Sequence, residues 1–421
     1  MSQNNDVVLG KDLSNGKRTV AFLSIALIYF FYCYNFMIST FTKVAMIDGF
    51  GFSLLETETI YSFMTIGTII GTFFFGSMAA RVGKKRTLII LAFSIAITTA
   101  IPFLSPENVM VWTVARTMTG TALGGMFGTC MPLVADMFPS KYRGKLAAFL
   151  TSLYSLSMIF GGWVYGVLGS HNWEGLMLTA IIPPAIGGIL VYMFVPDDHD
   201  MAVAAYEKSV RDGEKISYVQ MFKGKYLLIG LGVICLSACN KTGYAAFSNN
   251  STAYMESIGL SAAMAGSIFA AQGVGQTFGY WIWGAIADKY GRKKPRFGMA
   301  LVGVLLIGFI QLSSDQTTLI YATSVLIGFC VGFSGCWGAY YSEIFPEKYR
   351  SISAGVSFNG GYIIAAFINP VVATFTSASN LVPMYMVAIV LFVLGSVIWS
   401  FLPETLNKKA EEAKGDVAIQ K

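Results

Sequence analysis

Apolar residues in this chain form long runs separated by short polar connections. The runs predict helices at residues 19–46, 57–80, 87–104, 109–135, 146–169, 174–195, 227–255, 262–286, 297–313, 318–342, 352–376 and 382–402. A bilayer core about 30 Å thick needs about 20 mostly apolar residues per helix. Backbone polar groups in lipid must bond within the chain, which a helix achieves. The pattern therefore predicts an all-α membrane protein with twelve transmembrane helices.

The composition agrees with lipid as the solvent for much of the surface. Hydrophobic residues make up 55% of the 421 positions and charged residues only 12%, whereas soluble proteins carry roughly a quarter charged residues. Twelve spans use nearly the whole length, so we expect no separate soluble domain. The first apolar run follows a polar tail and is too long for the core of a signal peptide, so no cleavable signal is expected.

The basic residues predict the orientation of the chain. Every Lys and Arg except Lys43, Arg116 and Lys241 falls in a terminal segment or in a connection on the same side as the termini. By the positive-inside rule, both termini are expected in the cytoplasm and the protein in the plasma (inner) membrane. The net charge of +6 follows from this orientation, so no nucleic-acid partner is needed to explain it.

Two charged motifs occur twice at nearly the same separation. Residues 76–86 match 284–294 at a distance of 208 residues, and residues 136–143 match 343–350 at a distance of 207. Parallel six-helix repeats are a known transporter architecture. The repeat predicts a cytoplasmic tail (1–18), a six-helix half (19–195), a polar cytoplasmic linker (196–226) with a short amphipathic helix near 200–211, a second six-helix half (227–402) and a cytoplasmic tail (403–421).

These motifs resemble those of the major facilitator superfamily. The resemblance rests on the GxxxDxxGRKK form at 284–294 and its variant at 76–86, on Arg116-xxx-Gly120-xxx-Gly124, on the paired (D/E)xFPxxxR helix ends and on Pro403-Glu404-Thr405. The last two elements resemble the branch of sugar porters, metabolite:proton symporters and organic-ion transporters. The resemblance implies the major facilitator fold and secondary transport by alternating access between two pseudo-symmetric halves.

The repeated loops are expected to form a cytoplasmic gate. Asp288 is expected to accept bonds from a neighbouring helix N-terminus, where the helix dipole favours an anion, whereas Lys84 and Lys293 are interpreted as topology anchors. Ala80 stands where the family usually has aspartate, so the first half is expected to lack that carboxylate contact. The predicted gating residues are Arg81, Asp136, Arg143, Asp288, Arg292, Glu343 and Arg350.

Three cations fall within predicted spans, where a charge at the bilayer centre costs roughly 2.5–3.5 kcal/mol. Lys241 lies near mid-depth of the seventh span, and Arg116 lies in the outer part of the fourth. Lys43 is close enough to a helix end for its ammonium to reach water. No Asp or Glu lies deep in a span, and Glu58 is near a helix end. Buried cations without a central carboxylate favour an anionic substrate and disfavour an organic cation.

Further polar side chains are expected beside these cations at the substrate site. Tyr34 and Asn35 stand at the depth equivalent to Lys241 in the first half, where many metabolite:proton symporters carry an acidic residue. Gln272 and Gln276 share one helix face. The predicted substrate-binding residues are Lys241, Arg116, Tyr34, Asn35, Tyr244, Asn249, Gln272, Gln276, Trp337 and Asn359, and the Asn369–Pro370 step is expected to kink or break the eleventh helix.

The leading hypothesis is transport of a small organic anion, such as a monocarboxylate, aromatic acid or sugar acid, by proton symport or anion exchange. A neutral sugar-like solute is the first alternative, because the amides can bond hydroxyls, and drug or organic-cation efflux is less favoured. Lys241 in its neutral form, as a hydrogen-bonding or proton-carrying group, is a further alternative. A channel or a substrate-sensing receptor with the same fold also stays open.

An enzyme is not expected from this sequence. The two histidines lie in predicted loops, and the six cysteines fall in apolar runs without a CxxC pair, so neither a metal site nor a disulfide framework is expected. The GxxxxGK[ST] motif of ATP-driven transporters is missing. We expect a monomer without a cofactor, whose partners are the lipid bilayer, a small anionic substrate and protons.

Overall fold

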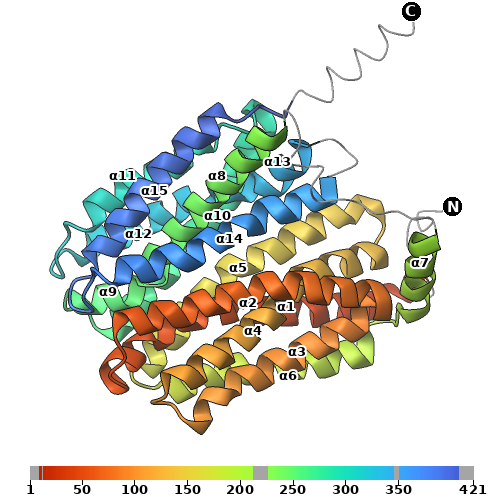
Figure 1. Cartoon of the computed structure of the whole chain (residues 1–421), viewed down its shortest axis with the longest axis horizontal. Helices are drawn as coiled ribbons and strands as arrows, with labels where there is room; N and C mark the ends of the chain where they lie inside the picture. The colour runs from red at the N-terminus through yellow and green to blue at the C-terminus, as the bar shows by residue number, and fades with distance from the viewer. Residues whose placement is uncertain (1–8, 12, 212–225, 346–349, 407–421) are drawn as a thin grey trace, which may run out of the picture. The chain divides into compact units, whose positions relative to one another are not determined.

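Every regular element in the described part of the chain is a helix, which confirms the predicted all-α class (Figure 1). This computed structural model describes residues 9–11, 13–211, 226–345 and 350–406, with the backbone alone at 140, 141, 144, 209–211, 226, 342 and 350–359. The helices are α1 (Asn15–Val44), η1 (Ala45–Gly49), α2 (Leu54–Val82), α3 (Lys84–Ala100), η2 (Ile101–Leu104), α4 (Val109–Met137), α5 (Ser140–Leu168), α6 (Trp173–Phe194), α7 (His199–Arg211), α8 (Tyr226–Ser248), α9 (Ser251–Ser257), α10 (Ala262–Tyr290), α11 (Arg296–Phe309), α12 (Thr317–Val331), η4 (Gly332–Cys336), α13 (Trp337–Glu343), α14 (Arg350–Ala373) and α15 (Val382–Phe401).

Packing divides the chain into two compact units. Unit 1 consists of residues 1–215, 251–270 and 377–379, and unit 2 of residues 216–250, 271–376 and 380–421. The repeat places 251–270 in the second half, whereas packing places this segment in unit 1. The units therefore follow the contacts of the folded chain, and the half boundaries stay a prediction from the repeat.

Each predicted apolar run is helical over most of its length. In the described residues, eight helices have the length and hydropathy needed to cross a membrane, and 296–309 and 360–373 are shorter apolar helices. Large apolar side chains such as Phe73 and Phe74 on α2 are more than half exposed, which suits a surface in contact with lipid. The chain is thus a helical membrane protein, and the count of twelve spans stays a prediction.

Close helix contacts repeat between the two units at the separation found in the sequence. In unit 1, a Cβ atom on Gly71 of α2 would lie 1.8 Å from the carbonyl oxygen of Thr121 on α4. In unit 2, a Cβ atom on Gly279 of α10 would lie 2.2 Å from the carbonyl oxygen of Phe329 on α12. Gly71 and Gly279 are 208 residues apart. The sequence repeat is therefore a repeat of close helix packing, which small residues permit in membranes.

The repeated loops begin at glycines that no other residue replaces without strain. Gly83 has a φ of 98° at the end of α2, and Gly291 has a φ of 120° at the end of α10. These left-handed backbones favour glycine and turn the chain sharply into the next helix. We call the end of each unit that carries such a loop its basic end, and the other end its opposite end.

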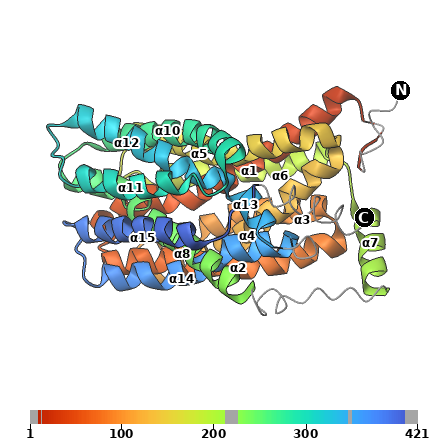
Figure 2. The same cartoon turned by 90° about the horizontal axis from the view of Figure 1, so that it is seen from above.

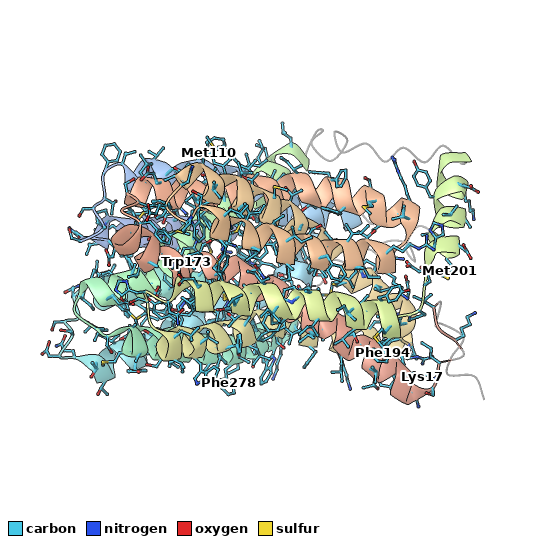
Figure 3. All side chains as sticks on the ribbon, turned by 90° about the horizontal axis from the view of Figure 1, so that it is seen from below. Lys17, Met110, Trp173, Phe194, Met201 and Phe278 are labelled. Atoms are coloured by element: carbon cyan, nitrogen blue, oxygen red, sulfur yellow. The ribbon has the colours of Figure 1, made fainter. Side chains whose placement is uncertain are left out.

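The helix α7 confirms the short amphipathic helix expected near 200–211, and it crosses the other helices at the basic end of unit 1 (Figures 1 and 2). His199 Nδ1 lies 3.0 Å from the Val82 carbonyl oxygen. Met201 on α7 and Phe194 lie at this end, while Met110 and Trp173 lie at the opposite end (Figure 3). The segment after α6 is therefore folded against the first repeated loop.

Helix interruptions occur at places other than the expected one. The seventh run is split after Ser248, where α8 ends and α9 begins at Ser251, and the tenth passes through the 3-10 turn η4. In contrast, α14 runs through Asn369 and Pro370 to Ala373, so the structure shows no break there. A membrane helix tolerates proline because neighbouring groups bond the freed carbonyl.

Candidate functional site

In unit 1, the predicted pair Tyr34 and Asn35 faces α6. The Tyr34 hydroxyl lies 2.9 Å from Thr179 Oγ1, and the Asn35 amide donates to the Ala180 carbonyl oxygen at 3.1 Å. Asn35 also accepts a bond from the Thr99 hydroxyl at 3.2 Å, and it is fully buried. The Asn35 amide therefore joins α1, α3 and α6 inside the bundle.

Arg116 is a buried cation of the same unit. Only 1% of its surface is exposed, and Nη2 donates to the Met177 sulfur at 3.2 Å. The guanidinium carbon lies 5.8 Å from the centre of the Trp112 ring. Neither Nε nor Nη1 has a hydrogen-bond partner in the described residues. A thioether and an aromatic ring are weak partners for a charged guanidinium, so Arg116 keeps donors for a ligand.

Three predicted residues converge on one turn of α6. Tyr34 and Asn35 reach Thr179 and Ala180, and Arg116 reaches Met177. Beside Arg116, the ring of Trp112 lies 6.0 Å from that of Trp173, the first residue of α6. These aromatic rings are apolar neighbours that keep water from the guanidinium.

Lys43 forms a buried ion pair, so the expectation that its ammonium reaches water is wrong. Its Nζ lies 2.5 Å from Glu58 Oε1, and the two side chains are 3% and 0% exposed. The reason is that the helix does not end at Val44 but continues as the π-helical turn η1, which ends at Gly49. Lys43 therefore lies inside the bundle, and Glu58 is enclosed with it.

In unit 2, Lys241 contacts a tyrosine that the sequence did not single out. Lys241 Nζ lies 3.0 Å from the Tyr362 hydroxyl and 4.4 Å from the centre of that ring. Tyr362 belongs to α14 and follows the predicted site residue Asn359 by three positions. Residues three apart share a helix face, so this spacing could have predicted Tyr362 from the sequence. Tyr244, one turn beyond Lys241, packs its ring 5.5 Å from that of Phe247.

Several amide side chains of unit 2 are buried, and some of their polar atoms lack a hydrogen-bond partner in the described residues. Gln272 and Gln276 are 3% and 1% exposed, and Gln276 donates to the Tyr280 hydroxyl at 2.6 Å. Gln272 Nε2, Gln276 Oε1, Asn249 Nδ2 and both amide atoms of Asn369 lack partners in the described residues. A buried polar atom without a partner costs about 1–3 kcal/mol, so these amides are candidates for contacts with water or a ligand.

The remaining predicted site residues are less informative. Trp337 is fully buried and packs in an aromatic core, with ring centres 5.1 Å from Tyr341 and 5.8 Å from Trp399. The side chains of Asn359 and Arg350 lie outside the described residues. Because the two units are described separately, the joint action of Arg116 and Lys241 stays a prediction.

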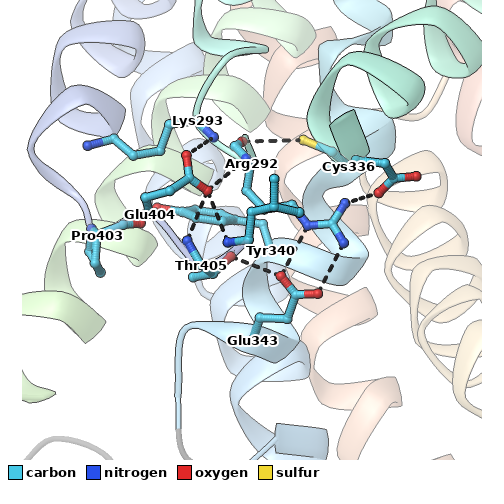
Figure 4. A network of polar contacts seen from close by, with 10 residues as sticks. Arg292, Lys293, Cys336, Tyr340, Glu343, Pro403, Glu404 and Thr405 are labelled. Carbon is cyan, nitrogen blue, oxygen red and sulfur yellow. Dashed lines mark hydrogen bonds and ion pairs between the residues drawn. The ribbon is translucent and has the colours of Figure 1, made fainter. Parts of the chain in front are cut away.

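A network at the basic end of unit 2 joins the predicted gating residues Arg292, Asp288 and Glu343 (Figure 4). Arg292 binds both Glu343 oxygens, through Nε and Nη2 at 3.1 Å each, and its Nη1 pairs with Asp288. Glu404 accepts from the backbone N–H of Arg292 at 2.7 Å and of Lys293 at 3.1 Å. We call Asp288, Arg292, Lys293, Glu343 and Glu404 the second loop cluster.

Glu404 accepts hydrogen bonds from the backbone N–H groups that follow Gly291. Partial burial acts to raise the pKa of Glu404, but bonds from backbone N–H groups, including those of Lys293 and Arg292, outweigh it and hold the pKa below its usual range. Asp288 is exposed and pairs with the Arg292 side chain instead. The expected bond from Asp288 to a neighbouring helix N-terminus stays a prediction.

A corresponding network lies at the basic end of unit 1. Lys84 Nζ lies 2.8 Å from Asp136 Oδ2, so this lysine pairs with a predicted gating residue. Asp198 is 2% exposed and accepts from the backbone N–H of Lys84 at 2.8 Å and of Lys85 at 3.0 Å. We call Lys84, Lys85, Asp136 and Asp198 the first loop cluster. Asp198, like Glu404, is a residue that sequence reasoning missed.

The other predicted gating residues of unit 1 lie beside this cluster. The Arg81 guanidinium carbon is 5.3 Å from the centre of the Tyr206 ring on α7, and Arg143 donates to the Phe138 carbonyl oxygen at 3.1 Å. Neither makes an ion pair with Asp136 in the described residues. Their gating roles stay predictions.

Comparison with known proteins gives the family of this chain. The sequence model of the Major Facilitator Superfamily matches residues 25–367, and again residues 233–419. A cis,cis-muconate transport protein of Acinetobacter baylyi is 24% identical over 360 residues, covering 82% of this chain and 85% of that protein. A sialic acid transporter of Escherichia coli is 22% identical over 372 residues, covering 86% and 88% of the two chains.

The fold has a close counterpart among solved structures. The crystal structure of a D-xylose-proton symporter superposes with a TM-score of 0.71 at 17% sequence identity, covering 92% of this chain and 98% of that one. At this identity the likeness concerns the fold alone.

Proposed function

Because this chain belongs to the Major Facilitator Superfamily, we propose that it carries a small organic anion across the membrane by secondary active transport. Membership of the family makes the chain an integral membrane transporter and not an enzyme. The class of solute, the coupling ion and the orientation are the proposed part.

The buried guanidinium of Arg116 is the main observation that supports an anionic substrate. It is almost completely buried, and two of its nitrogens lack partners in the described residues. A charge removed from water is costly unless an opposite charge or hydrogen-bond acceptors surround it. A carboxylate offers two oxygens that match the guanidinium fork. An anionic substrate therefore supplies what Arg116 lacks.

Lys241 is the second cation that we assign to the substrate. It contacts the Tyr362 hydroxyl, which can donate a hydrogen bond to a carboxylate. A lysine in a membrane-spanning helix is a functional candidate by default. Its neutral form would instead make it a hydrogen-bonding or proton-carrying group, and the experiment below separates these roles.

The relatives support the proposal and also its closest rival. The muconate and sialic acid transporters are named for carboxylate solutes, which favours an anion. The D-xylose symporter is named for a neutral sugar, and the buried amides of Gln272, Gln276 and Asn369 suit hydroxyl groups. We rank the anion first because amides bind hydroxyls and carboxylates alike, whereas a buried guanidinium is costly beside a neutral solute.

Transport would proceed by alternating access, with protons as the coupling ion or with anion exchange as a variant. We propose twelve spans with both termini in the cytoplasm, since all lysines and arginines outside the three intramembrane cations fall on that side. The two loop clusters would then lie at the cytoplasmic surface of a monomer in the plasma membrane.

Ligand-induced thermal stabilisation of the purified protein tests the solute class. The panel contains cis,cis-muconate, N-acetylneuraminate, benzoate, D-xylose and choline, and the variants are Arg116→Met and Lys241→Gln. We expect a carboxylate to stabilise the parent, and we expect neither variant to respond. Arg116→Met should melt higher than the parent without ligand, because an apolar side chain replaces a buried charge that has weak partners.

The control is Arg86→Gln, which removes one positive charge at an exposed pair with Asp197 and should respond like the parent. Stabilisation by D-xylose or choline alone would overturn the anion proposal. Counterflow of the stabilising carboxylate in proteoliposomes then separates a carrier from a sensor, because only a carrier exchanges labelled for unlabelled solute.

A further inference from the structure

A single carboxylate is buried within the membrane-spanning helices that the structure describes. Glu58 on α2 is 0% exposed, and its partner Lys43 on α1 is 2% exposed. The other fully buried carboxylate of the described residues, Asp198, lies in the loop at the basic end. Glu58 is therefore the one fully buried acidic group of the described transmembrane helices.

A purely structural role does not explain this pair well. Removing two charges from water costs free energy that their attraction only partly returns, and apolar pairs of similar size are often as stable. Ionisable groups inside a membrane protein mark ion or proton pathways more often than packing. The pair is also compact, because Lys43 Nζ and Glu58 Oε1 are 2.5 Å apart.

We propose that Glu58 binds the coupling proton of the transport cycle and that Lys43 is its counter-charge. The proposal rests on the proposed function, since it needs a transported anion. In the empty protein the pair is a carboxylate beside an ammonium and has no net charge. A proton from the solution at the opposite end adds to the Glu58 carboxylate to give a carboxylic acid. Lys43 keeps its own proton, so the pair gains one positive charge.

Charge balance links this proton to the substrate. Protonation of Glu58 leaves the buried Lys43 ammonium beside a neutral carboxylic acid, and a monovalent substrate anion brings one negative charge. The protein loaded with one proton and one monoanion therefore has the same buried charge as the empty protein. By linkage, each ligand raises the affinity for the other by the same factor. The cycle is electroneutral for a monoanion.

Other charged groups lie near this end of α2, and Glu58 is the fully buried acid among those described. On the elements packed against α2 at its opposite end, the charged groups are Asp48 in η1 and Arg116 on α4. Asp48 is exposed, so its protonation does not change the buried charge. Glu256 on α9, which packs against α1, is only partly buried and accepts a hydrogen bond from the Tyr165 hydroxyl. Arg116 holds its proton under all physiological conditions. The acidic and basic groups of α3 and α7 lie at the basic end.

A substrate-free experiment tests the titration of Glu58 itself. Infrared difference spectra of the full chain in lipid vesicles, taken between acidic and neutral pH, should show a protonated buried carboxylic acid in the parent. The band should be lost in Lys43→Met/Glu58→Gln, which removes both charges together and so keeps the buried net charge unchanged. A parent without the band, or a double variant that keeps it, overturns the proposal.

A transport experiment tests the coupling, with cis,cis-muconate, N-acetylneuraminate and benzoate as labelled probes. The double variant should keep counterflow within about threefold of the parent, while accumulation driven by a proton gradient falls to the level set by the membrane potential alone. A purely structural pair predicts parental accumulation in the double variant, and that result overturns the proposal. If the parent counterflows no carboxylate, the proposed function fails, and the infrared titration still decides whether Glu58 takes a proton.

Discussion

The two loop clusters bind the backbone N–H groups that follow a glycine with different side chains. In both units a carboxylate from the segment after the last helix of a repeat accepts two backbone N–H groups that follow a positive-φ glycine. Asp198 does this for Lys84 and Lys85, and Glu404 does it for Arg292 and Lys293. The N–H groups lie at the start of α3 in unit 1 and in the turn before α11 in unit 2, and bonds to them need only a carboxylate of the right reach. This part of the cluster therefore survives a change from Asp to Glu.

The side-chain pairing differs between the clusters. Arg292 holds Glu343 with two parallel bonds and pairs with Asp288 as well, whereas Lys84 offers a single ammonium to Asp136 and Asp198. A guanidinium fork fixes a carboxylate in orientation, and an ammonium acts as a point charge. Unit 1 lacks the aspartate at Ala80, and Asp198 takes up the second contact of Lys84. The bonds from the carboxylate to the backbone N–H groups are therefore common to both clusters, whereas the ion pairs between side chains vary.

Arg292→Met should have the largest effect, because it removes three charged contacts at once. The two bonds to Glu343 form one ion pair, and a charged contact contributes about 1.5–3 kcal/mol, while the pair with exposed Asp288 adds little. We expect a loss of about 2–3 kcal/mol in the free energy of unfolding, measured by denaturant titration in micelles.

Lys84→Met is the matched variant in unit 1 and should cost about half as much, because an ammonium makes no parallel pair of bonds. Equal losses from the two variants would mean that the fork geometry of Arg292 contributes nothing beyond its charge.

Asp198→Ala should have the next largest effect. The change leaves two N–H groups at the start of α3 without their acceptor, and loss of such a cap costs about 0.5–2 kcal/mol. Hydrogen exchange read by mass spectrometry should show faster exchange at Lys84 and Lys85. Asp197→Ala is the control, since Asp197 is exposed and pairs with exposed Arg86. Unchanged exchange in Asp198→Ala would show that water replaces the carboxylate at no cost.

The sequence predicted the helices well because their signal is local. Apolar runs of about 20 residues report a helix in lipid whatever surrounds them, and the repeat at 208 residues placed Gly71 and Gly279 at equivalent helix contacts. The break between Ser248 and Ser251 was missed, because no glycine or proline marks it and tertiary contacts decide it.

The site was predicted only in part, because contacts depend on which face a residue presents. Arg116 was found from its charge alone, but its α6 neighbour Met177 carries no such signal. A shift of 207 residues aligns Glu404 with Asp197, whereas the structure uses the next residue, Asp198. Asp and Glu differ in reach by one methylene, which a sequence alignment does not weigh. Lys43 was misplaced because the extension of α1 into η1 was not visible in the apolar pattern.

Acid should weaken the second loop cluster through Glu404. Its pKa is held below the usual range in the folded protein, so its contribution to stability is fully present above the pKa of the unfolded chain and is lost as pH falls through the folded pKa. Because Glu404 is exposed, we expect a loss below about 1 kcal/mol. Glu404→Gln should lack this acid dependence when unfolding is titrated against pH. A variant that follows the parent at every pH would assign the acid sensitivity to another carboxylate.

Ala80→Asp should have the smallest effect and gives the sharpest test of the comparison. It places in unit 1 the carboxylate that Asp288 supplies in unit 2, four residues before Lys84. Residues 80 and 84 lie on different helices, α2 and α3, and an exposed ion pair of this kind is worth about 0.2–1 kcal/mol. Lys84 already has Asp136 and Asp198, so we expect a gain at or below that range in the free energy of unfolding. In the Asp198→Ala background, Ala80→Asp should increase the free energy of unfolding by more, because Lys84 has then lost its contact with Asp198. Equal gains in both backgrounds would show that Asp198 does not take the place of the missing aspartate.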